Sequence, residues 1–266
     1  MNIILNGKKV EIEKPVSIKE LIKIKNISAD VFIINSFPVS IDHIVFENDN
    51  VTLIKKGVMP TYEELEYMII SRQGLDLYNK LKKATVVIAG IGGLGSHAAA
   101  SLVRIGVGNI KIIDFDVVEP SNINRQFYFI DQIGMQKTEA LTINLKRINP
   151  YVNITFSNTY LAEENIINEL KNHNVILECF DNPLSKMLLV EKCIKELPES
   201  YIIGASGVAG YYNTEDIKIK KLGKNCIIVG DFEHEATFNE SLMAPRVSVC
   251  ANIQANEAVK YLLKDI

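Results

Sequence analysis

The spacing of apolar residues changes near residue 84, and the change divides the chain. From Thr85 onward, runs rich in β-branched residues alternate with segments whose apolar residues recur at helical spacing. Strands are predicted at residues 85–90, 109–116, 152–156, 175–180 and 201–206. Helices are predicted from Leu94 and at residues 135–148, 163–171, 184–196 and 247–263. This alternation indicates a mainly parallel sheet with both faces covered, so residues 85–266 are predicted to form a doubly wound α/β domain.

Residues 1–57 follow a different pattern, with short apolar strands and one helix. Two strands flank Asn6-Gly7, which is a hairpin-turn signal. Ser17 and Glu20 have the spacing of a capping box, which predicts the start of a helix. Apolar runs at residues 31–35 and 51–55 predict further strands. This order of elements in so short a segment predicts a small α+β domain of the β-grasp, ubiquitin-like kind.

Residues 58–84 are predicted to be a helical linker between the two domains. Thr61 is placed to cap the helix, and several glutamates follow it near the positive end of the helix dipole. Arg72 and Gln73 precede Gly74, and a glycine inside a helix costs ~1 kcal/mol relative to alanine. We therefore expect the helix to break near Arg72.

The composition is that of an ordinary globular protein, with 47% hydrophobic and 23% charged residues among 266. The net charge of -3 gives no electrostatic reason to expect a nucleic-acid partner. None of the four cysteines pair as C-x-x-C, which favours a reducing compartment and argues against disulfides. No apolar run approaches the ~20 residues of a membrane span, and the N-terminus does not look like a signal peptide. We therefore expect a cytoplasmic protein without a membrane partner.

A glycine-rich loop follows the first strand of the larger domain. Residues 90–95 read GIGGLG, which satisfies G-x-G-x-x-G between a strand and a helix. Glycines let the backbone approach a phosphate at the helix N-terminus, and Asp114 ends the next strand, where a ribose-binding carboxylate is usual. The loop predicts a Rossmann-like adenine-nucleotide site but does not separate NAD from ATP. Its predicted nucleotide ligands are Gly90, Gly92, Gly93, Gly95 and Asp114.

Three further segments favour ATP: DFDVVEPSNINRQ at residues 114–126, GMQK at 134–137 and CFDN at 179–182. Attack by a carboxylate on an α-phosphate brings two anions together, so the site must supply positive charge. Arg125 and Lys137 are the candidate cations, Asn122 is a neutral donor, and Asp181 is a candidate Mg²⁺ ligand. Taken singly, Lys137 could be a solvated helix lysine and Asp181 could be a helix N-cap.

The chain resembles the ThiF/MoeB adenylyltransferases, which are relatives of the ubiquitin-activating enzymes. The resemblance extends from about Ser71 to the C-terminus. It is carried by SRQ at 71–73, the three segments above, the glycine loop, MAP at 243–245 and QA-x-EA at 254–258. It implies ATP-dependent adenylylation of the C-terminal glycine carboxylate of a small sulfur-carrier protein with a Gly-Gly tail. It also implies a homodimer and the release of pyrophosphate.

The resemblance assigns roles to individual residues. Arg72 corresponds to the arginine that reaches the ATP phosphates from the other subunit, and Asp181 to the metal-linked aspartate. Because the substrate's own carboxylate attacks, no enzyme nucleophile is implied. The implied catalytic residues are Arg72, Arg125, Lys137 and Asp181. The implied nucleotide ligands, besides the glycines and Asp114, are Asp116, Asn122 and Gln126.

The chain also departs from the family pattern. Residues 1–57 resemble the sulfur carriers of thiamine and molybdopterin synthesis, but the chain continues beyond Gly57, which favours a packing or docking module. The two C-x-x-C pairs that bind structural zinc in many members are missing, so no zinc is expected. The fused ThiS-like unit and the missing zinc cysteines favour a thiamine-pathway carrier.

The segment 226–241 is expected to include the loop that crosses over the carrier's tail. Residues 234–241 contain no cysteine, whereas thiamine-pathway members often have one there, and Cys226 is interpreted as incidental. The neighbouring run Glu233-His234-Glu235 is interpreted as solvated charge rather than as a metal site.

Other functions fit parts of the same pattern. The glycine loop and Asp114 alone would suit an NAD-dependent oxidoreductase, whose cofactor would bind without Mg²⁺. A non-catalytic protein that docks carriers would keep the β-grasp unit without needing the four charged residues. Within the family, the substrate could instead be a molybdopterin-type carrier, a small carboxylate or a tRNA-linked carboxylate.

Overall fold

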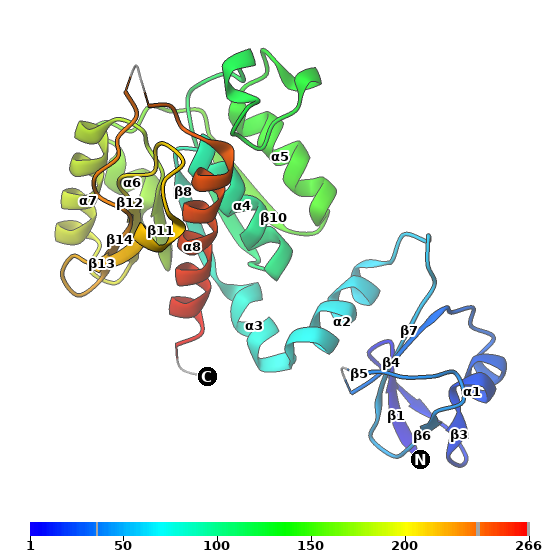
Figure 1. The fold of residues 1–266 in the computed structure, drawn as a ribbon. Helices are drawn as coiled ribbons and strands as arrows, with labels where there is room; N and C mark the ends of the chain where they lie inside the picture. The colour runs from blue at the N-terminus through cyan, green and yellow to red at the C-terminus, as the bar shows by residue number, and fades with distance from the viewer. Residues whose placement is uncertain (36, 238–239, 265–266) are drawn as a thin grey trace. The chain divides into compact units, whose positions relative to one another are not determined.

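The chain forms two compact units, Met1–Asn79 and Lys80–Ile266 (Figure 1). The computed structural model describes residues 1–35, 37–237 and 240–264. Each unit has its own hydrophobic core. Among the described residues, no helix is both long enough and apolar enough to cross a lipid bilayer.

Residues 1–54 of the N-terminal unit form a five-stranded sheet and helix α1 (Ile18–Lys25). The strand order is β2-β1-β7-β4-β5, and only β1 and β7 run parallel to each other. The strands are β1 (Asn2–Leu5), β2 (Lys8–Glu11), β4 (Val31–Ile34), β5 (Phe37–Pro38) and β7 (Asn50–Ile54). Strands β3 (Val16–Ser17) and β6 (Ile44–Val45) form a small second sheet. The helix begins at the predicted capping box, in which Ser17 Oγ accepts the Glu20 N–H.

The turn between β1 and β2 is also set by local sequence. Asn6 and Gly7 both have positive φ values, 43° and 76°, as the tight hairpin turn requires. A Cβ atom at Gly7 would lie only 1.5 Å from the Tyr67 ring. Helix α2 (Tyr62–Gln73) therefore packs closely against the hairpin and belongs to the N-terminal unit.

The break predicted near Arg72 occurs at Gly74, where α2 ends and α3 (Leu75–Lys83) begins. Gly74 has a φ of 87°, and its N–H bonds to the Ile70 carbonyl oxygen. Across the break, the Tyr78 hydroxyl donates to Glu66 Oε1 at 2.7 Å. The helical segment is thus two braced helices rather than one.

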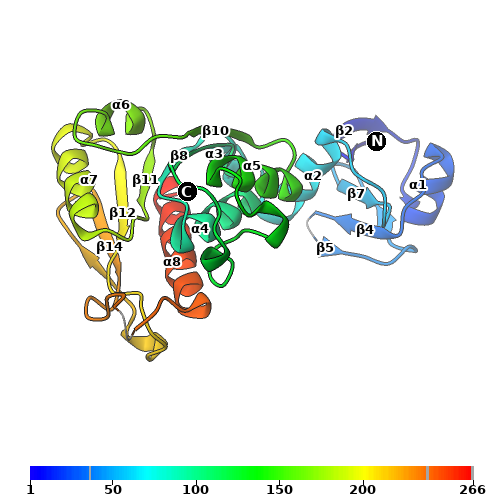
Figure 2. The same ribbon diagram turned by 90° about the horizontal axis from the view of Figure 1, so that it is seen from above.

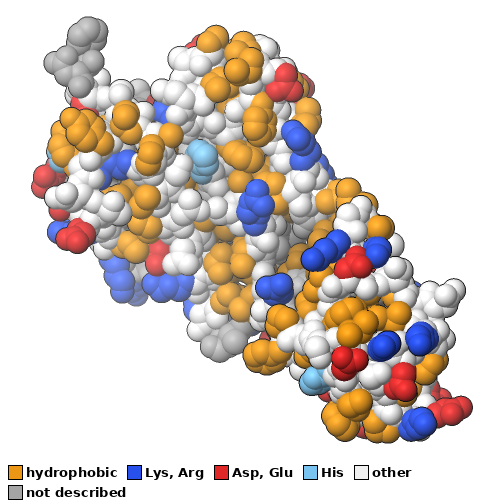
Figure 3. Space-filling view, turned by 45° about the vertical axis from the view of Figure 1, so that its right-hand side comes forward, with side chains coloured by type: hydrophobic (Ala, Val, Ile, Leu, Met, Phe, Trp, Pro, Cys, Tyr) orange, Lys and Arg blue, Asp and Glu red, His pale blue; other side chains and the backbone are white. Residues whose placement is uncertain are grey.

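On the face shown in Figure 3, acidic and basic side chains are mixed over the N-terminal unit, at the lower right. Apolar side chains lie among them on the same face. Phe37 and Phe46 are among the exposed apolar residues of this unit.

The C-terminal unit contains a seven-stranded sheet in the order β10-β9-β8-β11-β12-β14-β13. All neighbouring strands are parallel except β13, which runs antiparallel to β14. The first five strands are β8 (Thr85–Ala89), β9 (Asn109–Ile113), β10 (Asn153–Ser157), β11 (Val175–Glu178) and β12 (Tyr201–Ala205). The last two are β13 (Lys218–Lys221) and β14 (Cys226–Gly230).

Helices cover both faces of this sheet (Figure 2). Helices α6 (Ile166–Leu170) and α7 (Pro183–Glu196) pack on one face, in a core with residues of β8, β11 and β12. Helices α4 (Gly93–Ile105) and α8 (Ala244–Leu262) pack against each other on the other face, with α5 (Lys137–Ile148) beside α4. The doubly wound Rossmann-like fold with a preceding ubiquitin-like domain is thereby confirmed.

The chain reverses its direction of winding between β8 and β11. It runs outward from β8 through β9 to β10, and then returns to place β11 on the other side of β8. Adjacent strand ends diverge at such a switch point, so the crevice outside the carboxyl ends of β8 and β11 is where a doubly wound fold binds ligands. The glycine loop follows β8 and Asp181 follows β11.

One local prediction differs from the structure. Helix α6 spans only Ile166–Leu170, because residues 163–165 form a turn before it. The segment 226–241, expected to include the loop over the carrier's tail, begins with strand β14, which is inserted between β12 and β13. Its apolar run from Cys226 to Val229 is mostly buried, so it extends the sheet and the loop begins only at Asp231.

Candidate functional site

Packing accounts for three of the four glycines in the loop. A Cβ atom at Gly95 would lie 2.0 Å from the Gly90 carbonyl oxygen, so only glycine lets α4 approach the loop. A Cβ atom at Gly93 would lie 2.8 Å from Val247 Cγ1. Gly90 has a φ of 85°, and a Cβ atom there would lie 3.0 Å from the Cys179 carbonyl oxygen of the loop after β11. The two loops of the switch point are therefore in close contact.

Gly92 has no comparable packing constraint. Its φ is -73°, and a Cβ atom there would meet nothing closer than Gln126 Nε2 at 3.6 Å. Gly92 is also the N-cap of α4 and supplies no side-chain acceptor to the helix. The first N–H groups of a helix need acceptors, so this end of α4 is suited to bind an anion close to its backbone.

The Asp114 carboxylate holds the loop in place. Its Oδ2 accepts the Ile91 N–H at 2.9 Å, and its Oδ1 accepts the Asp116 N–H at 2.9 Å. Burial raises the pKa of this carboxyl, and the nearby Lys137 charge and the two backbone hydrogen bonds oppose that rise. Asp114 thus connects the glycine loop to the end of β9, and its predicted contact with a ribose stays a prediction.

Lys137 is not the solvated helix lysine of the alternative interpretation. It is the first residue of α5, and its side chain is only 7% exposed. Its Nζ lies 2.8 Å from Asp116 Oδ2, and its backbone N–H bonds to the Asp116 carbonyl oxygen. The lysine charge is therefore held beside the end of β9, with the half-exposed Asp116 as its counter-ion.

Among the residues that the structure describes, Arg125 and Gln126 each have a buried polar atom without a hydrogen-bond partner. Arg125 donates through Nη1 to the Ser121 carbonyl oxygen at 2.8 Å and to Asn124 Oδ1 at 2.9 Å, but its Nε has no acceptor. Gln126 Oε1 likewise has no donor. Such atoms cost free energy unless a ligand or water satisfies them. Both residues follow the end of β9, next to the glycine loop.

Three side chains hold this segment against the start of α4. Ser96 Oγ donates to the Gly92 carbonyl oxygen at 2.6 Å and accepts the Phe127 N–H at 3.0 Å. His97 Nε2 lies 3.2 Å from the Arg125 carbonyl oxygen. The buried Tyr128 hydroxyl donates to the Ile91 carbonyl oxygen at 2.8 Å. No local motif in the sequence marks these side chains as part of the site.

Asn122 has a structural role in the same segment. Its Oδ1 accepts the Glu119 N–H at 3.1 Å, which closes a short 3₁₀ turn. Its Nδ2 donates to Ser121 Oγ at 3.4 Å, and its carbonyl oxygen accepts the N–H groups of Arg125 and Gln126. Asn122 therefore shapes the backbone that carries Arg125.

Asp181 follows β11 and is exposed. The helix N-cap is its neighbour Asn182, whose Oδ1 accepts the Ser185 N–H at 3.0 Å. This excludes the alternative that Asp181 is itself the cap. Within the described part of the chain, the Asp181 carboxylate has no hydrogen bond or ion pair.

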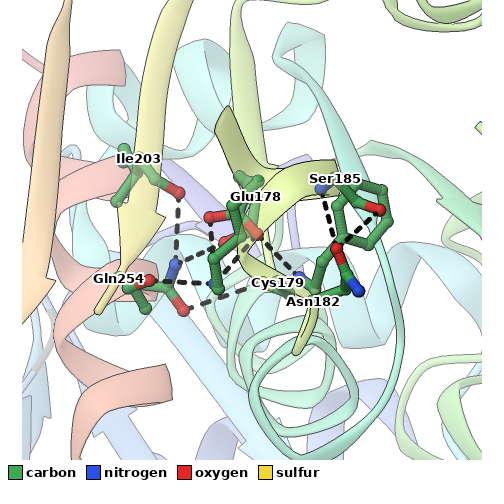
Figure 4. Close-up of polar contacts among 9 residues, drawn as sticks. Glu178, Cys179, Asn182, Ser185, Ile203 and Gln254 are labelled. Atoms are coloured by element: carbon green, nitrogen blue, oxygen red, sulfur yellow. Dashed lines mark hydrogen bonds and ion pairs between the residues drawn. The ribbon is translucent and has the colours of Figure 1, made fainter. Parts of the chain in front are cut away.

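A buried network fixes the end of strand β11, three residues before Asp181 (Figure 4). Glu178, the last residue of β11, has a side chain that is 1% exposed and pairs with Lys186 Nζ at 3.0 Å. Gln254, from α8, donates to the carbonyl oxygens of Glu178 and Ile203, both at 3.1 Å. Sequence reasoning missed Glu178 and Lys186, although a glutamate inside the apolar run VILECF was a signal that it needed a buried partner.

The donor set suits Mg²⁺ bound together with a nucleotide. Mg²⁺ is commonly held by one or two carboxylates plus substrate phosphates, and Asp181 offers one free carboxylate. A self-contained metal site would need more ligands. Within residues 1–35, 37–237 and 240–264, no group of three or more His, Cys, Asp or Glu side chains is arranged to hold a metal.

The loop after β14 is organised by the Asp231 carboxylate. Its Oδ1 accepts the N–H groups of Glu233 and His234, and its Oδ2 contacts His234 Nδ1 at 2.8 Å and pairs with the buried Arg246. Burial opposes ionisation, but these hydrogen bonds hold the pKa of Asp231 at about 2. His234 is thus tied into the loop, while Glu233 and Glu235 are exposed. Phe238 and Asn239, further along it, lie outside the described residues.

Cys226 is buried in β14. Burial raises the pKa of its thiol to about 11, so it carries almost no thiolate at neutral pH. Arg72 lies at the exposed end of α2, in the N-terminal unit.

The fold and the site define a protein with a Rossmann-like α/β domain that is preceded in the sequence by a ubiquitin-like domain. Residues 65–265 match the model of the ThiF family, and residues 1–57 match the model of ThiS-like ubiquitin. The chain belongs to the ThiF family, as the motifs predicted.

Curated relatives agree with this assignment. The chain is 32% identical to the molybdopterin-synthase adenylyltransferase of Haemophilus influenzae, over 76% of this chain and 85% of that protein. It is 30% identical to ubiquitin-like modifier-activating enzyme 5 of Oryza sativa subsp. japonica, over 74% of this chain and 52% of that protein. The chain thus spans only about half of the rice protein.

Solved structures share the fold. The E. coli tRNA N6-threonylcarbamoyladenosine dehydratase TcdA, solved in complex with ATP, superposes with a TM-score of 0.69. The match covers 78% of this chain and 98% of TcdA at 19% identity, so it supports the fold alone.

Proposed function

We propose that this protein uses ATP to adenylylate the C-terminal glycine carboxylate of a small ubiquitin-like sulfur-carrier protein. The observation that carries the proposal is the buried Nε of Arg125, which has no acceptor among the described residues and lies next to the N-terminus of α4, where no side chain caps the helix. Arg125 follows β9 and Asp181 follows β11, and these two strands lie on either side of β8. An anionic ligand would satisfy the Arg125 Nε and the helix N-terminus, and a metal-linked phosphate would use Asp181.

The reaction needs charge rather than a nucleophile. A carboxylate oxygen of the carrier attacks the α-phosphorus of ATP, the bond from that phosphorus to the bridging oxygen breaks, and pyrophosphate leaves. Arg125 and Lys137 offset the charge that develops, since fixed cations are already in place before the reaction. Gln126 and the backbone at Gly92 bind phosphate oxygens, and Asp114 and Asp116 lie at the ribose side.

Bound Mg²⁺ would neutralise phosphate charge, and Asp181 would hold it. An NAD-dependent oxidoreductase would not need the buried Lys137, the buried Arg125 Nε and the exposed Asp181 carboxylate around one glycine loop. A non-catalytic docking protein gives no reason to hold these charges on braced elements.

The carrier proposed here is of the ThiS type, in thiazole synthesis. The support is the chain's own ThiS-like unit, together with the absence of C-x-x-C pairs from its sequence. The Haemophilus relative, a molybdopterin-synthase adenylyltransferase, favours a molybdopterin-type carrier as the second candidate.

ATP–pyrophosphate exchange tests both candidates. The full chain is incubated with labelled pyrophosphate, ATP, Mg²⁺ and one carrier of either type, each with its Gly-Gly tail intact or with the last glycine removed. Exchange that requires the intact tail supports adenylylation, and the carrier with the higher kcat/KM identifies the type. No exchange with any tailed carrier, together with NAD binding by calorimetry, would overturn the proposal.

We also propose that the protein works as a homodimer in which Arg72 acts on the partner's site. The support is its permanent charge, its exposure at the end of α2 and the break between helices α2 and α3 at Gly74. Arg72→Ala and Asp181→Ala proteins, each inactive alone, should regain part of their exchange activity when refolded together. Mixed dimers that stay inactive, or a protein that sediments only as a monomer at micromolar concentration, would contradict this arrangement.

A further inference from the structure

Glu178 is a buried carboxylate at the end of the strand that leads to Asp181. A buried charge without a partner is strongly unfavourable. The groups that contact the Glu178 carboxylate therefore indicate its role. Lys186, one turn into α7, donates to both carboxylate oxygens, at 3.0 and 3.2 Å, and to the Ala205 carbonyl oxygen at 2.9 Å. The Lys186 ammonium thus uses its three donors on β11 and β12, the two strands beneath the loop.

The same carboxylate reaches forward into the loop. Glu178 Oε1 also accepts the Phe180 N–H at 2.7 Å, two residues on. Behind it, the Cys179 N–H bonds to the Ala89 carbonyl oxygen at 2.9 Å. Asn182 closes the loop from the other side as the N-cap of α7. The backbone on either side of Asp181 is therefore pinned.

Gln254 supports this arrangement from α8, on the opposite face of the sheet from α7. Its Nε2 bridges the carbonyl oxygens at the ends of β11 and β12, and its Oε1 lies 3.7 Å from Cys179 Sγ (Figure 4). The strand ends are thus clamped between α7 and α8, while Asp181 itself has no hydrogen bond or ion pair with any residue that the structure describes. The loop presents one free carboxylate on a rigid base.

We propose that the buried Glu178–Lys186 pair is a positioning device that holds the Asp181 carboxylate in place to receive the Mg²⁺ of bound nucleotide. The inference rests on the proposed function. The carboxylate of the pair accepts the Phe180 N–H, and its ammonium donates to the carbonyl oxygen at the end of β12. Because Lys186 lies in the first turn of α7, the ion pair connects the loop, β12 and α7. Neutralisation matters as well, because an unpaired Glu178 would add a second negative charge beside the phosphates.

Affinity for nucleotide with and without Mg²⁺ tests the inference on the full chain. The variants are Lys186→Met, which removes the ammonium and keeps an unbranched stem, and Lys186→Arg, which restores a cation. Lys192→Met is the matched control, because Lys192 lies on the same helix and pairs with Glu163 at 3.2 Å on the surface. A double variant, Glu178→Gln with Lys186→Met, avoids a lone buried carboxylate if Lys186→Met alone does not fold.

Mutation of a residue that supports a metal ligand typically lowers the affinity for the metal 10- to 100-fold. We therefore expect Lys186→Met and the double variant to lose ~10-fold or more of the Mg²⁺-dependent gain in ATP affinity. Binding of ATP without Mg²⁺ should stay within about twofold of wild type in the double variant, which leaves no unpaired carboxylate, and should fall further in Lys186→Met alone. Lys186→Arg should recover part of the gain, and Lys192→Met should match the wild type.

Amide hydrogen exchange gives a readout that does not involve nucleotide. The Phe180 amide should exchange faster in Lys186→Met than in Lys192→Met, since its acceptor is no longer held. Wild-type protein without any Mg²⁺-dependent gain would overturn the proposed function. A gain that is equal in wild type and in the Lys186 variants, with unchanged Phe180 exchange, would overturn only the positioning role.

Discussion

The loops after β8 and β11 meet at the switch point of the sheet but are built in opposite ways. The loop after β8 consists of backbone, with glycines where α4, Val247 and the neighbouring loop come too close for a Cβ atom. The loop after β11 depends on side chains, namely Glu178, Lys186 and Gln254, which hold it from below. Backbone N–H groups can bind a phosphate without any side chain, whereas a carboxylate that binds a metal has to be held in one orientation by its neighbours.

Substitution of the glycines should have the largest effect and should separate packing from binding. Gly95→Ala places a Cβ atom 2.0 Å from the Gly90 carbonyl oxygen, so α4 must shift or the protein must unfold. We expect it to lose ~3 kcal/mol of stability or more in urea unfolding, at or above the usual cost of overpacking.

Gly92→Ala is the matched control, because its Cβ atom has space and its φ is ordinary. It should lose only about 1 kcal/mol of stability, the ordinary cost of a point substitution and well below the loss expected for Gly95→Ala. Its affinity for ATP should fall, because the new methyl group lies where phosphate approaches. Equal stability of the two variants would contradict the packing explanation for Gly95.

Removal of charge from either side of the crevice should lower the rate and leave the fold intact. Arg125→Ala and Asp181→Ala should each reduce carrier-dependent ATP–pyrophosphate exchange by ~10²-fold or more, since preorganised charge at a phosphoryl centre contributes about 3 kcal/mol. Arg104→Ala, in the last turn of α4 and exposed, serves as the control. Near-normal exchange in either variant would remove that residue from the mechanism.

The loop after β14 is also held by charge, which predicts a pH dependence of stability. The pKa of Asp231 is about 2 in the folded protein against an ordinary 3.8. A lowered folded-state pKa stabilises the protein above the unfolded value, and this contribution is lost as pH falls from about 4 to about 2. We expect it to be about 1–2 kcal/mol at neutral pH.

Asp231→Asn isolates this contribution. The difference in free energy of unfolding between wild type and Asp231→Asn should shrink steadily between pH 4 and pH 2. A difference that stays constant over that range would show that the ionised carboxylate is not what stabilises this loop.

Cys226→Ser should have the smallest effect. The thiol is buried in β14 with a pKa raised to about 11, and adenylylation needs no enzyme nucleophile. Exchange with the carrier should therefore remain within about twofold of wild type. Loss of exchange by a folded Cys226→Ser protein would assign the cysteine a role in the reaction.

The two loops also differ in how far they could be predicted. The glycines, the following helix and Asp114 lie close together in the sequence, and their spacing sufficed to predict the nucleotide loop. Asp181 was picked out by motif, but the residues that aim it were not. Lys186 and Gln254 come from two helices on opposite faces of the sheet, and no local pattern joins them to Glu178.

The sequence by itself determined most of the strands and helices, their alternation in the larger domain and the family, because these depend on local periodicity and on motifs within a few residues. Tertiary structure alone decided that β14 enters the sheet, that α2 packs on the hairpin at Gly7, and that Glu178 is neutralised by Lys186. Such facts depend on which surfaces meet when the chain folds. A buried charge signals that it needs a partner, and only the packed strands and helices identify which one it has.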